Sequence, residues 1–247
     1  MVTFNDKILE ARANKFRREN GIANDVAVDF ENLLRALDVL TVFKPLSGEF
    51  SGMALKTKNN SFMLVNTNVS VGRQHFTIGH ELYHLFIQNG FSFQMCNAGK
   101  FNKKDREEYN ADIFSSYFLL PEAAIIKQIP EEELAWGEEI SLGTVIKLEQ
   151  YFGVSRTALL IRLEKIGLLR KDYSDWLINI TKSAVEFGYS DKLYRRSEDF
   201  RVVGNYGAKA KELFDEGKIS ESHYHSLMYD INIDVDNPDL IEDDKEI

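Results

Sequence analysis

The sequence predicts an α+β protein in which amphipathic helices surround a small β-sheet and further helices follow. Apolar residues recur at helical spacing up to about residue 37 and again from residue 69. Between residues 39 and 68 the period shortens to about two, which is typical of strands. Because 44% of the 247 residues are apolar and 12% are aromatic, the chain can bury a substantial core.

The chain is acidic overall, with 39 acidic and 30 basic residues and a formal net charge of -9. DNA phosphates and anionic membrane surfaces attract cations, so this balance disfavours a protein that works on either, although a local basic patch is compatible with it. The single cysteine, Cys96, excludes an internal disulfide and fits a reducing compartment. The N-terminal residues carry no uninterrupted apolar run and no window approaches the roughly 18 apolar residues of a membrane span. We therefore expect a cytoplasmic protein without a membrane partner.

The first two elements are predicted to be helices that support the sheet. Residues 4–19 alternate apolar and charged positions at helical spacing and end at Asn20-Gly21. Asn24 is predicted to cap a second amphipathic helix. The buried stripe of that helix is predicted to comprise Val26, Val28, Phe30, Leu33, Leu34 and Leu37.

Three short runs rich in β-branched and aromatic residues predict a three-stranded sheet that ends in a hairpin. They cover residues 40–44, 49–55 and 61–66. Proline, glycine and asparagine separate the runs, as expected of turns.

Residues 69–89 are predicted to form a helix that carries an HExxH sequence beginning at His80. Four residues advance a helix by slightly more than one turn, so the imidazoles of His80 and His84 project from one face, about 6 Å apart at their Cβ atoms. Two ligands of a zinc site are thereby placed by the backbone. Glu81 lies about 100° further round the helix, where it can act as a general base without being a ligand. The alternative is a pair of hydrogen-bonded core histidines with Glu81 in a salt bridge, which is costly to bury.

Residues 90–104 show no clean period and mix three phenylalanines with glycine and asparagine. They predict a loop that acts as a rim or lid over the metal site. From this loop Cys96 could occupy the open metal position, although a cysteine in a loop is more often a plain small residue.

A zinc site with two histidines is incomplete, and the helix predicted at residues 105–120 supplies the candidates for a third ligand. Glu108 and Asp112 lie one turn apart on a single face. We predict that Glu108 is the third ligand and that Asp112 holds a ligand histidine through its other ring nitrogen. Glu107 is the competitor, but it points about 100° away from Glu108 and has no acidic partner one turn on.

The two predicted helices together resemble the ImmA/IrrE family of metallo-endopeptidases. Residues 73–84 follow the family pattern R-x-x-F-T-[IL]-x-H-E-L-x-H, and residues 108–121 follow E-x-x-A-[ND]-x-F-A-x-x-L-L-x-P. The sequence departs from the pattern at Tyr83, where the family often has glycine, and at Ser115, where it often has alanine. The tyrosine is expected to narrow the cleft near the metal. The resemblance covers about the first half of the chain.

The resemblance implies a zincin-like fold, one Zn2+ ion bound by His80, His84 and Glu108, and Glu81 as the general base. The same ligands would also accept Mn2+ or Fe2+. It further implies a protein substrate, namely a helix-turn-helix repressor of the phage or mobile-element type, which the peptidase cleaves to relieve transcriptional repression. Such a protein would be a zinc metallo-endopeptidase.

In zinc peptidases of this build, the edge strand beside the motif helix commonly receives the substrate chain by strand addition. Either segment 49–56 or segment 61–66 could take that role here. The sequence leaves this choice open.

Four regions are predicted along the chain. They are a metallopeptidase domain (1–130), a helix-turn-helix-like module (131–171), a C-terminal helical region (172–233) and an acidic tail (234–247). The first boundary is placed at an acidic connector, residues 131–139, and the tail carries seven acidic residues and one lysine.

The helix-turn-helix-like module is predicted from helices at 140–151 and 155–168 around a turn at Gly153. Its positive charge comes from Arg156, Arg162, Lys165, Arg170 and Lys171. Acidic neighbours offset it: Glu149, Glu164 and Asp172. We therefore favour packing on the peptidase domain or gripping of a protein substrate over direct DNA binding. Further helices are expected at 176–187, 207–216 and 220–229.

The alternative function is a regulator that does not cleave. Such an antirepressor would sequester a repressor, or bind DNA or protein, through its C-terminal helices. Binding affinity does not require a catalytic water, so the same helices serve either function.

Overall fold

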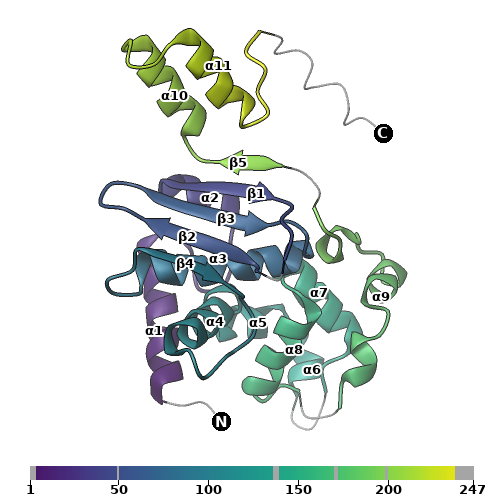
Figure 1. Ribbon diagram of the computed structural model, residues 1–247. Helices are drawn as coiled ribbons and strands as arrows, with labels where there is room; N and C mark the ends of the chain where they lie inside the picture. The colour runs from purple at the N-terminus through teal and green to yellow at the C-terminus, as the bar shows by residue number, and fades with distance from the viewer. Residues whose placement is uncertain (1–3, 49, 136–138, 170–171, 198–199, 237–247) are drawn as a thin grey trace.

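The computed structural model has the α+β fold that the sequence predicts, and it describes residues 4–48, 50–135, 139–169, 172–197 and 200–236. One mixed sheet has the strand order β4-β2-β3-β1-β5. Its strands are β1 (Val39–Lys44), β2 (Gly52–Lys56), β3 (Ser61–Asn66), β4 (Phe93–Cys96) and β5 (Arg201–Val203). Helices α3 and α4 lie below the sheet, and α10 and α11 lie beyond β5 (Figure 1).

Helices make up most of the remaining described chain. Up to residue 165 they are α1 (Phe4–Glu19), α2 (Phe30–Ala36), α3 (Val71–Phe86), α4 (Arg106–Leu119), α5 (Glu122–Gln128), α6 (Glu131–Leu134), α7 (Leu142–Phe152) and α8 (Arg156–Lys165). Later elements are α9 (Ile180–Glu186), α10 (Tyr206–Asp215), α11 (Glu221–Tyr229) and the short 3-10 helices η1 (Ser174–Leu177) and η2 (Lys192–Tyr194).

The three predicted strands are present, but the sheet has two more. β1 pairs in parallel with β3, and β2 forms an antiparallel hairpin with β3. β4, which lies within the predicted loop 90–104, pairs with β2, and β5 pairs with β1. Segments 49–56 and 61–66 therefore do not offer the free edge proposed for a substrate chain, because β2 and β3 are interior strands. Among the described strands the edges are β4 and β5.

The second helix begins later than predicted. Asp29, rather than Asn24, is the N-cap of α2, and its Oδ1 atom accepts from the amide of Asn32 at 3.1 Å. The residues between Asn24 and Asp29 are not helical, and the buried Arg17 side chain donates to one of their carbonyls. Its guanidinium donates to the carbonyl of Val26 at 2.5 Å and to that of Phe118 in α4 at 2.6 Å. Arg17 thus ties α1 to both segments.

One hydrophobic core extends from α1 through the sheet, α3 and α4 into α7 and α8. Leu148 of α7 and Leu160 of α8 belong to the same buried cluster as Phe16 and Phe118. The core therefore continues across residue 131, and the domain boundary predicted there stays a prediction. α10 and α11 form a separate small cluster around Tyr224 and Met228.

The helix pair α7–α8 has the predicted turn. Gly153 ends α7 in the left-handed conformation at φ 64°, and Ser155 caps α8. Two of the arginines considered for DNA contact are not available for it, because Arg156 and Arg162 are 1% and 2% exposed. Arg162 donates to the carbonyl of Leu120 at 3.0 Å, so it joins α8 to the end of α4.

Some predictions fall outside the described residues: those on Glu138, Arg170, Lys171 and most of the acidic tail, residues 237–247. Within the described part of the chain, we find no helix with the length and apolar character that crossing a membrane requires.

Candidate metal centre

The HExxH sequence lies in the C-terminal half of α3, a helix that is buried on nearly every side. Small residues permit this close packing. A Cβ atom added at Gly79 would lie 2.5 Å from the Ser115 Oγ atom of α4, and one added at Gly52 of β2 would lie 2.5 Å from Thr77 Cγ2. The Ser115 hydroxyl donates to the carbonyl of Phe76 at 2.8 Å, so the serine that replaces the family's alanine is satisfied.

Three predicted ligand groups converge between α3 and α4. The Nε2 atoms of His80 and His84 lie 3.1 Å apart. Glu108 places one oxygen 3.5 Å from His80 Nε2 and the other 3.3 Å from His84 Nε2. Ligands at about 2.0–2.1 Å from a tetrahedral zinc lie about 3.3–3.4 Å from one another. The three groups are therefore spaced as ligands of one small cation would be.

Each imidazole is held through its other nitrogen. His80 Nδ1 donates to Asp112 Oδ1 at 2.8 Å, as the sequence analysis predicts. Asp112 also accepts from the amides of Gly99 and Phe101, each at 2.7 Å, which fixes the carboxylate. Both interactions leave the Nε2 lone pair of His80 directed at the centre.

The corresponding partner of His84 was not predicted. Its Nδ1 donates to Gln88 Oε1 at 2.5 Å. Gln88 lies four residues after His84, just beyond the end of α3. This spacing is the signal that sequence reasoning could have used.

Glu81 is buried within the centre, beside the thiol of Cys96. It is 0% exposed, and neither carboxylate oxygen has a hydrogen-bond partner among the described residues. Burial raises the pKa of Glu81 to about 7, although the charges of His80 and His84 oppose this shift. An unpaired carboxylate in such a place is costly unless a cation or a reacting proton uses it.

The neighbouring groups titrate in opposite directions. Burial alone would lower the pKa of His80, but its hydrogen bonds with Asp112 and Glu108 and the charge of Glu81 raise it to about 10. Burial alone would raise the pKa of Glu108, but the two imidazoles hold it well below its usual range. The carboxylates and the His80 imidazole therefore stabilise each other's charge at this centre, a role that a bound cation would take over.

The two glutamates considered for the third ligand position are separated by the structure. α4 begins at the N-cap Asp105, whose Oδ1 accepts from the amides of Glu107 and Glu108. From there Glu108 reaches the imidazoles, whereas Glu107 accepts a hydrogen bond from the hydroxyl of Tyr83 at 2.7 Å. Tyr83 is 2% exposed and is engaged with α4.

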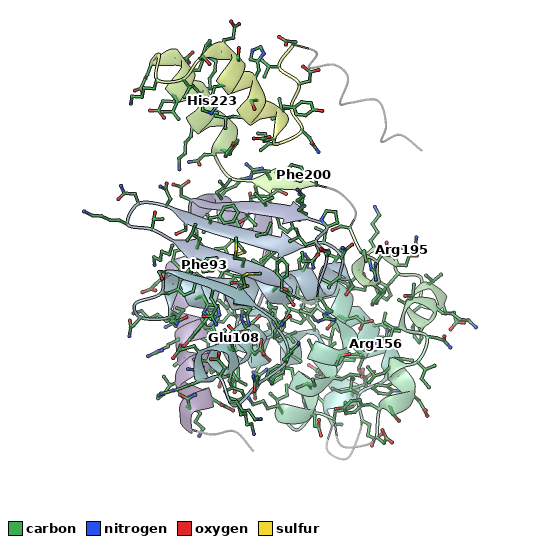
Figure 2. The ribbon with its side chains drawn as sticks, viewed as in Figure 1. Phe93, Glu108, Arg156, Arg195, Phe200 and His223 are labelled. Atoms are coloured by element: carbon green, nitrogen blue, oxygen red, sulfur yellow. The ribbon has the colours of Figure 1, made fainter. Side chains whose placement is uncertain are left out.

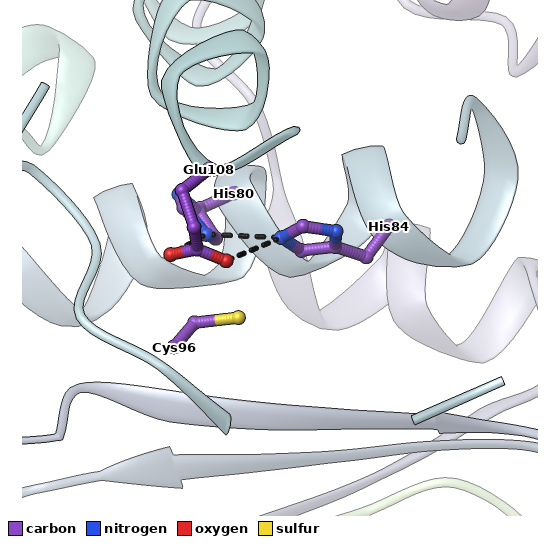
Figure 3. Close-up of side chains that lie close together, drawn as sticks. All are labelled: His80, His84, Cys96 and Glu108. Atoms are coloured by element: carbon purple, nitrogen blue, oxygen red, sulfur yellow. Dashed lines mark hydrogen bonds and ion pairs between the residues drawn. The ribbon is translucent and has the colours of Figure 1, made fainter. Parts of the chain in front are cut away.

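A fourth side chain reaches the same point from the sheet. Cys96 of β4 is 1% exposed, and its Sγ lies with ligand atoms of His80, His84 and Glu108 in a group whose members are all within 4.8 Å of one another. Figure 3 shows these four side chains together, with the thiol on the sheet side. Gln94, on the same strand, donates to Glu108 Oε1 at 2.7 Å. Sequence reasoning did not assign Gln94.

The donor set suits a divalent metal. Two imidazoles and a carboxylate are common ligands of zinc in peptidases, and iron and manganese accept them too. The converging lone pairs and the unpartnered carboxylate of Glu81 fit such an ion. The roles assigned to His80, Glu81, His84, Glu108 and Asp112 stay predictions that this geometry supports.

Comparison with known proteins matches the chain to a family model and to solved structures that include a transcriptional regulator. A peptidase family model described as "IrrE N-terminal-like domain" matches residues 34–164, a little over half of the chain. A solved structure titled "Mycobacterium tuberculosis transcriptional regulator" aligns over 63% of this chain and 46% of that one, at 15% identity and a TM-score of 0.39. The chain thus spans slightly under half of that structure, and the score is too low to support an argument. No curated protein matches the chain.

Proposed function

The chain belongs to the IrrE N-terminal-like domain family of peptidases, and from this we propose that it is a zinc-dependent endopeptidase in which Glu81 is the general base. The family confirms the predicted resemblance and accords with a zincin-like fold. The observation that carries the proposal is the convergence of His80, His84 and Glu108 beside a buried carboxylate that has no hydrogen-bond partner among the described residues.

In the proposed reaction, His80, His84 and Glu108 hold the cation. When bound, the cation supplies a Lewis acid that polarises the scissile carbonyl and lowers the pKa of water towards neutrality. Glu81 accepts the proton of the attacking water and then delivers it to the leaving amine. Burial raises the pKa of Glu81, which is the direction that lets a carboxylate both accept and deliver a proton near neutral pH.

The neighbouring side chains prepare this chemistry. Asp112 and Gln88 accept from the Nδ1 atoms of the two histidines and so keep both Nε2 atoms free to bind. Gln94 orients Glu108 from the sheet. The buried surroundings keep bulk water away from Glu81, which strengthens the electrostatic interactions at the centre.

For the substrate, we propose a helix-turn-helix repressor of the phage or mobile-element type, cleaved to relieve repression. A peptidase acts on a protein, and the family resemblance supports a repressor as that protein. Direct binding of DNA by α7 and α8 is less favoured, because Arg156 and Arg162 are buried in interactions within the protein.

Cleavage of a purified repressor tests the proposal. We expect the zinc-loaded protein to produce one defined pair of fragments by intact mass spectrometry, and Glu81→Gln to bind zinc without producing them. Glu107→Gln is the matched control, since Glu107 contacts Tyr83 instead of the centre. A stable complex with the repressor but no fragments would instead support the antirepressor that acts by sequestration.

A further inference from the structure

Strand β4 presents two different faces to its surroundings. Phe93 and Met95 are 54% and 55% exposed, whereas Gln94 is half-buried and Cys96 is buried. Phe93 lies at the edge of the sheet, and Glu108 lies below it (Figure 2). The alternation of a strand therefore directs Gln94 and Cys96 towards the metal centre. This arrangement is the reverse of an ordinary amphipathic strand, whose large apolar residues face inward.

The pairing of β4 with β2 fixes the position of Cys96 relative to the metal centre. Cys96 lies opposite Gly52, and the carbonyl of Cys96 accepts from the amide of Ser51 at 2.9 Å. Gly52 also adjoins Glu81, because a Cβ atom added there would lie 2.9 Å from Glu81 Oε1. The thiol and the unpartnered carboxylate thus approach the centre from the same stretch of sheet.

The surroundings of Cys96 are not those of a small apolar residue in a core. Its Sγ lies within 4.8 Å of ligand atoms of His80, His84 and Glu108, and Cys96 is not a member of the main hydrophobic cluster. A buried cysteine usually packs as a small hydrophobe among apolar side chains. Here its neighbours are polar groups that share a common focus, among them the buried carboxylate of Glu81.

We propose that Cys96 is a fourth ligand of the cation, so that a thiolate from the edge strand closes the centre at rest. A thiolate binds zinc at about 2.3 Å, which places its sulfur about 3.6 Å from nitrogen and oxygen ligands. A movement on the order of 1 Å from the present separations of up to 4.8 Å achieves this. The thiol proton is released to solvent as the sulfur binds.

This inference rests on the proposed function and adds regulation to it. Zinc centres with four protein ligands are closed, whereas catalytic centres keep one position open for water or substrate. The peptidase is therefore latent until Cys96 leaves the cation. Among the described strands, the four-residue β4 pairs with β2 alone, and two of its side chains are largely exposed, so few apolar contacts oppose its displacement.

Zinc X-ray absorption of the full chain tests the ligand directly. We expect one sulfur at about 2.3 Å beside nitrogen and oxygen at about 2.0–2.1 Å in the wild type, and no sulfur in Cys96→Ser. Met95→Ser is the matched control, since it alters the adjacent, outward-facing residue of the same strand and should keep the sulfur signal. A zinc-loaded wild type with nitrogen and oxygen ligands alone would overturn the thiolate and leave the peptidase proposal standing. A wild type that binds no zinc would overturn both.

Cobalt and zinc titrations give a second measurement. Cobalt bound to the wild type should show a thiolate-to-metal charge-transfer band, which decides the matter even where Cys96→Ser does not fold. In Cys96→Ser we expect zinc affinity to fall at least about 10-fold and cleavage at saturating zinc to be faster. Equal affinities together with the absence of the charge-transfer band would contradict the proposal.

Discussion

Two of the places where the protein buries charge differ in how that charge is satisfied. In the helix pair α7–α8, Glu149 and Arg156 are 0% and 1% exposed, and Arg156 donates to both carboxylate oxygens of Glu149 at 2.6–3.2 Å. Further partners complete the pair, since Ser183 accepts from Arg156 at 2.8 Å and Tyr194 donates to Glu149 at 2.6 Å. In the metal centre, by contrast, Glu81 is equally buried and has no such partner among the described residues.

The difference separates a structural role from a functional one. An ion pair that is buried with its hydrogen bonds made holds together the segments that it joins. Here these are α7, α8 and the residues that follow α8. A buried carboxylate without partners weakens the fold unless something outside the chain uses it. Burial of charge alone therefore does not identify a site, whereas a carboxylate group buried with both oxygens unpartnered marks a candidate.

The largest effect is expected at the carboxylate that lacks partners. Glu81→Gln should lower the rate of repressor cleavage by about 10²- to 10⁴-fold, because the amide cannot accept a proton. Zinc content and thermal stability should be kept, since no hydrogen bond is lost. Cleavage rates and metal analysis of the same preparation check this, and unchanged proteolysis would remove Glu81 from the role of base.

Glu149, the carboxylate that has partners, should show the opposite pattern, because its substitution should affect stability and not zinc binding. Glu149→Gln should lower the free energy of unfolding by about 3–5 kcal/mol, because it leaves the guanidinium of Arg156 buried without its countercharge. Urea denaturation measures this, and zinc binding by the folded protein should be unaffected. Tyr194→Phe is a graded control, as it removes two hydrogen bonds, one to Glu149 and one from Gln150, each worth about 1 kcal/mol. If Glu149→Gln is as stable as the wild type, the contrast between the two places fails.

A smaller effect, on zinc binding, is expected at Asp112, which contacts His80 rather than the cation. Asp112→Asn should weaken zinc binding by about 10- to 100-fold, or about 1.4–2.8 kcal/mol, because His80 loses the carboxylate that fixes its ring. Competition with a coloured chelator measures the change. Zinc affinity equal to that of the wild type would show that the ring is oriented by packing alone.

The smallest effect is expected at Glu107. Glu107→Gln weakens only the hydrogen bond from Tyr83, so the free energy of unfolding should fall by no more than about 0.5–1.5 kcal/mol. Zinc affinity should not change, and the same chelator competition checks it. A variant that no longer binds zinc would mean that Glu107, rather than Glu108, is the third ligand.

Helical periodicity made much of the metal centre predictable from sequence. The spacing of His80 and His84, and of Glu108 and Asp112, depends only on the turn of a helix, and the structure brings these side chains together. Their roles stay predictions. The strands β1 to β3 were also predicted, because their alternation is regular.

Features that depend on tertiary context were missed. β4 was not predicted as a strand, because its large apolar residues Phe93 and Met95 point outward and Cys96 points inward. Its sequence pattern therefore resembles that of a loop. The arginines of α8 suggested a charged surface, but Arg156 meets Glu149 seven residues earlier and Arg162 meets a carbonyl 42 residues away. Periodicity within one element carries no information about such partners.

The contact between Gly79 and Ser115 has a consequence for metal choice. It limits how closely α3 and α4 can approach each other, and the two imidazoles belong to α3 whereas Glu108 belongs to α4. A methyl group at position 79 would push α3 and α4 apart and so lengthen the distances between the imidazoles and Glu108, without altering any donor atom. In the proposed centre, preference for a small ion over a larger one would thus depend partly on a residue that does not contact the ion.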